Sequence, residues 1–233
     1  MIVNPSAVRK RPSLGGGIYR IADIARYTQL HPSRVRSWFR GRSDGAGRGP
    51  VFDADYCAVG KTHTASFLDL IDVLVAGQFR ELGVTMRVVR AAYSHLQDRL
   101  KTKHPFCHEE LYTDGKEIII RAADAVGDSV LSEAVSGQRL FMQVLEHLAR
   151  IDFSHATKLA ERWRIAEGVV IDPKISMGKP VVESTGKTTF VIANCYVAND
   201  KDAGLVAELF DVEESDVLNA FSFEQQLRRQ HAA

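Results

Sequence analysis

The sequence predicts a mainly α-helical protein with small β-hairpins. Apolar residues recur at the spacing of an α-helix over residues 67–79 and again over residues 88–100. Strand signals are short and paired: an Asp-Gly turn at 114–115 precedes a β-branched stretch, and two apolar stretches lie within residues 169–182. Together these patterns indicate helices as the main elements and sheets of small size.

Charge is unevenly distributed along the chain. The 30 basic and 29 acidic residues of the 233-residue sequence leave a formal net charge of +1, which taken alone argues against nucleic-acid binding. Residues 1–50, however, carry a net charge of +8, and the remaining 183 residues a net charge of −7. The beginning of the chain is therefore the candidate surface for a polyanion, and the acidic remainder could complement a basic partner.

The first segment is expected to be a mobile basic arm over residues 1–17, which ends in a polar, glycine-rich stretch. Two short helices should follow. One covers residues 19–27, and the other begins at Pro32, whose fixed φ and missing N–H suit the first turn of a helix. Only Thr28–His31 separates them.

Small and apolar residues in these two helices have the spacing of a DNA-binding helix-turn-helix. Ala25 stands five residues before Leu30, and Leu30 stands five and eight residues before Val35 and Trp38. One departure is Gln29, at a turn position where many such motifs have a glycine that permits positive φ. With Val35 and Trp38 turned inward, side chains suited to phosphates and guanine edges point outward. The candidate DNA-binding residues are Ser33, Arg34, Arg36, Ser37 and Arg40, with Arg42 and Arg48 in the glycine-rich loop that follows.

The middle of the chain should contain both helices and strands. A short strand pair is expected at residues 51–59. Gly83 suits the position just after a helix C-terminus, and Thr85 suits the N-cap of the next helix. Beyond them, the sequence predicts the Asp-Gly hairpin at 112–121 and a helix at 138–149.

A change of pattern near residue 160 indicates two modules. Residues 169–182 predict two short strands around a turn, and helices at 202–210 and 215–227 form a second pair that resembles a helix-turn-helix. The expected division is an arm at 1–17, a head domain at 18–100, a connecting region of hairpin and helix at 101–160, and a C-terminal domain at 161–233.

The head domain resembles the DNA-binding domain of the MerR-like family. Tyr19–Ala25, Val35–Trp38 and Arg80–Thr85 carry the likeness, which covers about residues 18–100. The resemblance implies a winged helix-turn-helix that binds double-stranded operator DNA as a homodimer, with two recognition helices in successive major grooves. The long dimer helix and the effector pocket of MerR-type sensors are not visible in the sequence.

The C-terminal domain resembles a small domain of unknown function found in antitoxins that are paired with PIN-domain ribonucleases. Residues 170–182 and the helical pair that ends at Val217–Glu224 follow its pattern in order. A MerR-like head joined to this domain resembles the longer VapB-type antitoxins of actinobacteria. The resemblance implies a repressor that neutralises a PIN-domain ribonuclease toxin and binds the operator of its own operon.

PIN toxins cut RNA with a carboxylate cluster that holds a divalent metal, so an inhibitor can cover that site or place a cation within it. An apolar anchor followed by a basic tip, near the C-terminus of the chain, is suited to this task. The candidate toxin-binding residues are Phe221, Phe223, Leu227, Arg228 and Arg229.

Some patterns that resemble binding motifs are interpreted as structural. Gly186-Lys187-Thr188 matches the end of a phosphate-binding loop, but Val181 stands where the first glycine is needed. His104, Cys107 and His108 lie close together without a second ligand pair at zinc spacing. No cofactor or metal is therefore expected.

Enzymatic motifs are also missing. Asp69 and Asp72 are expected on the outer face or at the cap of a helix, and no catalytic triad or dinucleotide fingerprint is found. The chain is therefore not expected to be an enzyme. For His31, beside Pro32, a phosphate contact, an N-cap and simple exposure remain open.

The expected compartment is the cytoplasm. There is no run of 18 apolar residues and no apolar signal segment, so no membrane association is expected, and the three cysteines indicate reduced thiols. The alternatives to an antitoxin are a stand-alone MerR-like transcription regulator that senses a small molecule and an uncharacterised hydrolase. A neighbouring gene for a PIN-type protein would favour the antitoxin.

Overall fold

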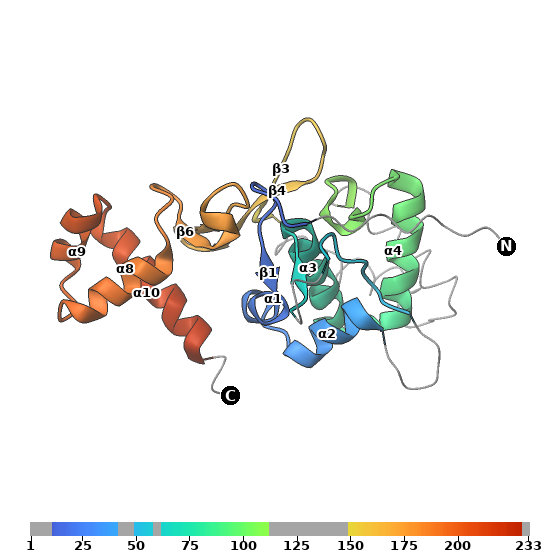
Figure 1. The fold of residues 1–233 in the computed structure, drawn as a ribbon, viewed down its shortest axis with the longest axis horizontal. Helices are drawn as coiled ribbons and strands as arrows, with labels where there is room; N and C mark the ends of the chain where they lie inside the picture. The colour runs from blue at the N-terminus through green and yellow to red at the C-terminus, as the bar shows by residue number, and fades with distance from the viewer. Residues whose placement is uncertain (1–10, 42–48, 58–61, 112–148, 230–233) are drawn as a thin grey trace.

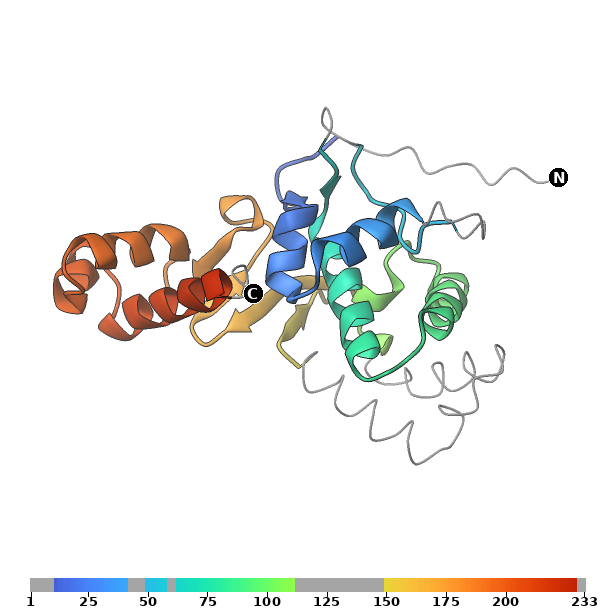
Figure 2. The same cartoon turned by 90° about the horizontal axis from the view of Figure 1, so that it is seen from below.

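A computed structural model describes residues 11–41, 49–57, 62–111 and 149–229 of the chain. These residues form seven α-helices and two small antiparallel sheets, so the prediction of a mainly α protein with small β elements is confirmed. Figures 1 and 2 place the N-terminal helices at one end of the molecule, the C-terminal helices at the other, and a sheet between them. The hairpin expected at 112–121 lies outside the described residues, as does the helix expected at 138–149 except for Ala149.

The head begins with a short strand and the two predicted helices. Strand β1 (Tyr19–Arg20) pairs with β2 (Thr64–Ala65), α1 covers Ile21–Thr28, and α2 covers Pro32–Arg40. Gln29 takes the left-handed conformation with φ of 59°, so this turn has the positive φ that a glycine usually provides.

The strand pair predicted at 51–59 is wrong for its described part, 51–57, which contains no strand. Instead, the backbone N–H groups of Val51 and Phe52 both donate to the carbonyl oxygen of Trp38, at 2.7 and 3.2 Å. These bonds hold the segment against the end of α2, and the Phe52 ring packs edge-on to the Trp38 ring. Because the helix carbonyl satisfies these backbone N–H groups, Val51 and Phe52 do not pair as a strand, and the segment contains only an isolated β-bridge at Tyr56.

Two long helices complete the head, and the end signals predicted at Gly83 and Thr85 are confirmed. Helix α3 (Phe67–Glu81) starts with a capping box, in which the Ser66 hydroxyl accepts from Asp69 N and the Asp69 carboxylate accepts from Ser66 N. Gly83 follows it with φ of 88°, and α4 (Met86–Leu100) begins after an N-cap in which the Thr85 hydroxyl accepts from Val88 N.

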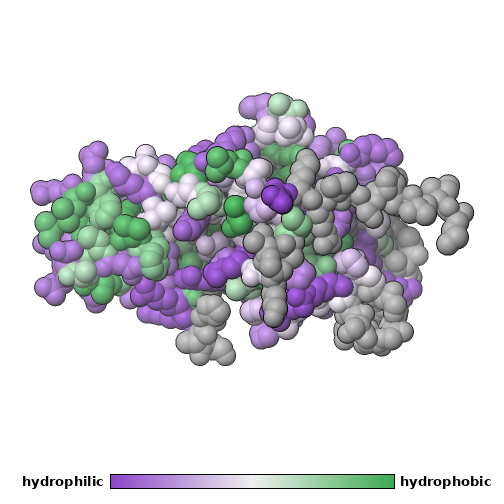
Figure 3. All heavy atoms as spheres, in the orientation of Figure 1, coloured by the Kyte–Doolittle hydropathy of each residue, from purple (hydrophilic) through white to green (hydrophobic). Residues whose placement is uncertain are grey.

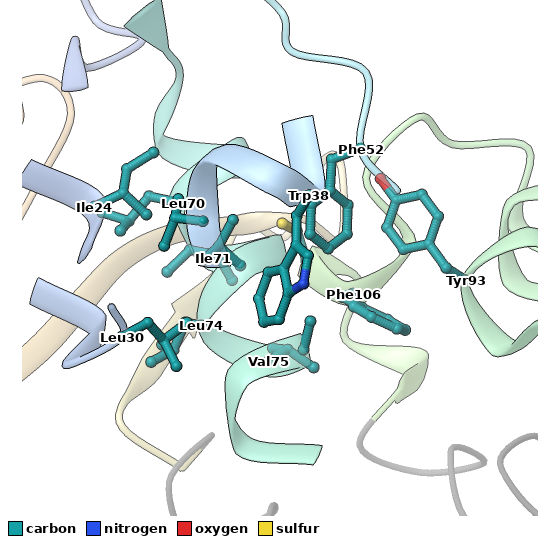
Figure 4. Close-up of a cluster of buried hydrophobic side chains, with 14 of the residues drawn as sticks. Ile24, Leu30, Trp38, Phe52, Leu70, Ile71, Leu74, Val75, Tyr93 and Phe106 are labelled. Carbon is teal, nitrogen blue, oxygen red and sulfur yellow. The ribbon is translucent and has the colours of Figure 1, made fainter. Parts of the chain in front are cut away.

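The core of the head forms around α3. Figure 4 shows side chains from α1, α2, α3 and α4 meeting there, together with Phe106 from the short 3₁₀ helix η1 (Pro105–Cys107). Phe52, Tyr93 and Phe106 pack edge to face in turn, with ring centroids 5.1 and 5.0 Å apart. Because other elements cover most sides of α3, even the carboxylates of Asp69 and Asp72 are buried.

A four-stranded antiparallel sheet connects the head to the C-terminal helices. Its strands lie in sequence order: β3 (Ile151–Phe153), β4 (Ala160–Ala166), β5 (Val169–Ile171) and β6 (Pro180–Val182). The predicted pair around residues 169–182 is confirmed as β5 and β6, with the 3₁₀ helix η2 (Ser176–Gly178) in the turn. Strands β3 and β4 were not predicted.

Three helices form the C-terminal end: α8 (Thr189–Ala198), α9 (Ala203–Phe210) and α10 (Glu214–Arg229). The two predicted helices near 202–210 and 215–227 are confirmed. The helices share a small core of their own, which includes Ile192, Val206 and Val217.

The sheet belongs to the core of the head as well as to the C-terminal end. Ile151, Ala160 and Trp163 join the same buried cluster as the head helices. Side chains of α10 pack on Val169 of β5. The sheet thus contains strands from before and from after residue 160, where the sequence predicts a domain boundary. The proposed domain limits remain a prediction. Among the described residues, no helix is long and apolar enough to cross a membrane.

Candidate functional site

Helix α2 separates apolar from polar side chains as its sequence predicts. Val35, Trp38 and Phe39 are buried against α1 and α3. Of the predicted DNA-binding residues, four are exposed and one is half-buried: Ser33, Arg34, Arg36 and Arg40, and then Ser37. Arg42 and Arg48 lie outside the described residues.

Some of these side chains have partners within the head. The Ser37 hydroxyl donates to the Arg34 carbonyl oxygen at 2.8 Å, and Arg40 Nε donates to His63 Nε2 at 2.9 Å. Within the described parts of the chain, the guanidinium groups of Arg34 and Arg36 make no hydrogen bond or ion pair. These two arginines are the cations of α2 that remain available to a ligand.

His31 is the N-cap of α2. Its Nδ1 lies 3.3 Å from Ser33 N, which donates to it, and 2.7 Å from Ser33 Oγ. Of the three roles open from the sequence, the structure assigns the cap. Ser33 is exposed but shares its hydroxyl with this cap, so it is less free than the arginines.

The predicted toxin-binding residues divide into two groups. Phe223 and Leu227 are only 5% and 4% exposed, because they pack against Val169 of the sheet. Phe221 is half-buried against Tyr196, with ring centroids 4.9 Å apart.

The two arginines that follow are exposed. Arg228 donates to Asn194 Oδ1 at 2.9 Å, and Arg229 lies 3.5 Å from Gln225 Oε1. With Val197, Lys201 and Phe221 they line a shallow hollow of about 380 Å³. The amphipathic pattern of the sequence does not show that Phe223 and Leu227 pack in the chain's own core instead of facing a partner.

A buried polar cluster lies between α3, α4 and η1, and the prediction of an outer-face position for Asp72, one of its members, is wrong. Asp72 was expected near the surface, but it is 0% exposed. Its carboxylate lies 2.8 Å from His104 Nδ1 and accepts from the Tyr93 hydroxyl at 3.0 Å. The other ring nitrogen of His104, Nε2, lies 3.0 Å from Asp55 Oδ2.

Burial and pairing shift the pKa values in this cluster. Burial disfavours the charged imidazole of His104, but hydrogen bonds to Asp55 and Asp72 outweigh this effect and raise its pKa to about 10. Burial also raises the pKa of Asp69 to about 6. The pKa of Asp55 is lowered despite its partial burial, because the His104 imidazolium lies beside it and Lys103 and Ser66 donate to it.

The same cluster contains potential metal ligands. Donor atoms of Asp72, His104 and Cys107 lie within 4.8 Å of one another, as do those of Asp55, Asp69 and His104. Both ring nitrogens of His104 already face carboxylates, so a metal ion in either group would have to replace one of these contacts. The arrangement fits an imidazolium held between two aspartates, and it agrees with the structural interpretation of His104 and Cys107.

Two larger hollows lie where the head meets the rest of the chain. One of about 610 Å³ is lined by residues that include Gly16, Tyr56, Lys103, Leu159 and Glu161. The other, of about 480 Å³, lies between α1 and the start of α8. Among the described residues, both hollows are large enough for a small molecule.

The chain is similar in fold to a solved structure. A scan against protein families finds no match, and a search of curated proteins finds none. Among solved structures, the chain is similar to the crystal structure of Rv2018 from Mycobacterium tuberculosis, with a TM-score of 0.69 and 22% sequence identity. The two chains share a fold. The alignment covers 91% of this chain and 99% of Rv2018, so the shared fold extends over both the head and the C-terminal end.

Proposed function

We propose that this chain is an antitoxin that binds operator DNA through α2 and neutralises a PIN-domain ribonuclease through its C-terminal end. One observation carries the proposal. Arg34 and Arg36 are exposed on α2 and have no partner among the described residues. Guanidinium groups so presented are suited to phosphate oxygens and to the O6 and N7 atoms of guanine.

The arrangement of α1 and α2 supports the DNA-binding half of the proposal. The two helices are joined by three residues, with positive φ at Gln29 and Leu30 buried in the turn. Together with the resemblance to the MerR-like family, this favours a winged helix-turn-helix head. A homodimer would then present two α2 helices to a pseudo-palindromic operator.

Arg34→Ala/Arg36→Ala tests this half. With the DNA fragment upstream of its own gene as probe, we expect the double variant to bind at least about 30-fold more weakly, because each of the two good base contacts is worth ~1–3 kcal/mol. If the contacts are to phosphate instead, the slope of log K against log salt falls by about two. Arg228→Ala/Arg229→Ala removes the same charge at the other end and should bind DNA normally. Equal binding by all three proteins would refute the assignment of α2.

The toxin-binding half rests on the resemblance of the C-terminal domain to antitoxins of PIN-domain ribonucleases. Its test is co-expression with the protein encoded by the neighbouring reading frame. We expect the two to copurify, and we expect the complex to be inactive in RNA cleavage. A neighbouring product without a PIN-type carboxylate set, or one that does not copurify, would contradict this half.

A stand-alone regulator that senses a small molecule is the second candidate. The hollow of about 610 Å³ beside Tyr56 and Lys103 favours it, since its size is that of a ligand pocket. DNA binding without any protein partner, together with a change of DNA affinity on adding a metabolite mixture, would favour this candidate over the antitoxin.

A further inference from the structure

Helix α9 presents an apolar face to solvent at the end of the molecule farthest from the head (Figure 1). Leu205 and Leu209 are 42% and 62% exposed, while Val206 and Ala207 are buried against the neighbouring helices. Leu205 and Leu209 are four residues apart and thus lie on one side of the helix. Figure 3 shows green apolar surface at this end, bordered by purple polar groups.

Acidic residues surround these leucines. Glu208 is exposed on the same side of α9, and Asp202 caps the helix by accepting from Leu205 N at 3.0 Å. Glu214 belongs to the same edge, because a Cβ on Gly204 would lie 3.6 Å from Glu214 Oε1 and 3.5 Å from Asp202 Oδ1. We call this surface, formed by Asp202, Leu205, Glu208, Leu209 and Glu214, the acidic leucine face.

The wider segment is acidic too. Residues 200–216 contain seven acidic residues and one lysine, Lys201. A second cation, Lys187, donates to the carbonyl oxygens of Phe210 and Asp211 at the far end of α9, where it offsets part of this charge. The segment as a whole remains strongly negative.

This charge decides between two classes of ligand for the C-terminal helical pair. The first turn of α10, which would be the recognition helix if the pair were a second DNA-binding motif, contains Glu214 and Asp216 and follows Glu213. Carboxylates there would repel phosphates. A basic protein surface with an apolar centre, in contrast, complements the acidic leucine face in both respects.

We propose that the acidic leucine face covers the basic RNA-binding groove of the ribonuclease partner. The inference rests on the proposed antitoxin function and names the surface and the mechanism. A ribonuclease must attract a polyanion, so the walls of its groove that hold the RNA backbone are basic, although the cleavage site itself is a carboxylate cluster. The carboxylates of α9 and α10 occupy the positions of RNA phosphates, and the two leucines provide the desolvated anchor. The chain then neutralises the ribonuclease by competing with RNA for the groove. This mechanism differs from one in which Arg228 and Arg229 enter the carboxylate cluster of the cleavage site.

Leu205→Gln/Leu209→Gln tests the anchor, since glutamine keeps helix propensity and length but removes the apolar contact. The probe is the purified PIN-domain ribonuclease encoded beside this chain, and binding is measured by titration calorimetry. We expect the affinity to fall at least about tenfold per leucine, as for buried interface anchors. The matched control is Phe190→Gln/Val191→Gln, two residues of α8 that are 58% and 48% exposed.

The mechanism has its own measurement. Glu208→Gln/Glu214→Gln removes two charges with little change of shape, so we expect a slower association rate and a weaker dependence of binding on salt. An RNA oligonucleotide should compete with the wild-type chain for the ribonuclease. Far-ultraviolet circular dichroism of each variant checks that the helices remain folded.

The possible outcomes distinguish a failure of the proposed antitoxin function from a failure of the binding surface assigned here. If the wild-type chain does not bind the ribonuclease, the proposed function fails and this inference fails with it. If the wild type binds and the leucine variant binds equally well while Arg228→Ala/Arg229→Ala does not, the inference alone is overturned. Loss of self-association in the leucine variant, seen by sedimentation, would assign the face to a second copy of this chain and would also overturn it. If Phe190→Gln/Val191→Gln lowers the affinity for the ribonuclease as much as the leucine variant does, the acidic leucine face is not the anchor and the inference is overturned.

Discussion

Replacing His104 with alanine should destabilise the head far more than loss of a surface charge. The imidazole is 6% exposed and lies between the carboxylates of Asp72 and Asp55, at 2.8 and 3.0 Å. Without it, Asp72 keeps the Tyr93 hydroxyl as a donor but loses its cation in a fully buried position. Breaking a buried ion pair in this way costs about 3–5 kcal/mol of unfolding free energy.

The assay is urea unfolding followed by tryptophan fluorescence, together with a thermal scan. For a chain of this length, a loss of about 3–5 kcal/mol lowers Tm by roughly 6–20 °C. The matched control is Lys103→Ala, which removes an ion pair to the same Asp55, with side chains 29% and 26% exposed, and should cost less than about 1 kcal/mol. Adding Asp72→Asn to the alanine variant should recover part of the loss, since it removes the unpaired charge.

The pH dependence has a definite sign. The pKa of His104 is raised to about 10 in the folded chain, so its contribution to stability is complete below its ordinary pKa near 6.5 and is lost as pH rises through about 10. The wild type should therefore lose stability between these values, and the alanine variant should lose less. If His104→Ala costs no more than Lys103→Ala, the imidazolium does not hold the cluster together and the reasoning is refuted.

Two further substitutions test the connection between the head and the C-terminal end. Gly178→Ala should lower the free energy of unfolding, measured in urea, by about 1–3 kcal/mol, because φ at Gly178 is +81° and the new Cβ would overlap the buried Tyr19 hydroxyl. The control is Gly49→Ala, since the space around Gly49 is open. A cost near zero would show that the turn can shift away from Tyr19. Glu224→Gln should weaken the contacts of α10 with Arg26 and with the Thr189 hydroxyl, which are 3.3 and 2.7 Å long. We therefore expect faster cleavage of the sheet region by a protease, and an unchanged cleavage rate would contradict this.

Local signals predicted the elements whose ends are set by their own residues. Pro32, Gly83 and Thr85 mark helix ends chemically, and each occupies the predicted position. The same holds for β5 and β6, whose apolar stretches flank a turn. Such features depend on neighbours within a few positions in the chain and can be read without knowing the fold.

The rest depends on contacts between distant segments. Strand β4 exists because it pairs with β3 and β5, and its arginines bind Asp152 and Glu183 across the sheet. Asp72 is buried because η1 and α4 cover a side of α3 that an amphipathic pattern would leave to solvent. Periodicity shows that a residue faces a given side of a helix but does not show what packs there, so it could not separate Phe223 from a partner-binding residue.

The pair formed by Arg26 and Glu224 makes α1 a neighbour of both ends of the molecule. Arg26 belongs to the helix that supports α2, and Glu224 belongs to the helix that follows α9. A ligand that binds at one end and alters this contact changes the free energy of ligand binding at the other end. Thermodynamic linkage requires the effect to be equal in both directions. If occupation of the C-terminal end strengthens operator binding by some factor, operator binding strengthens that occupation by the same factor. If the proposed function holds, the concentration of partner that silences the operon is set at this contact as well as at the two proposed binding surfaces.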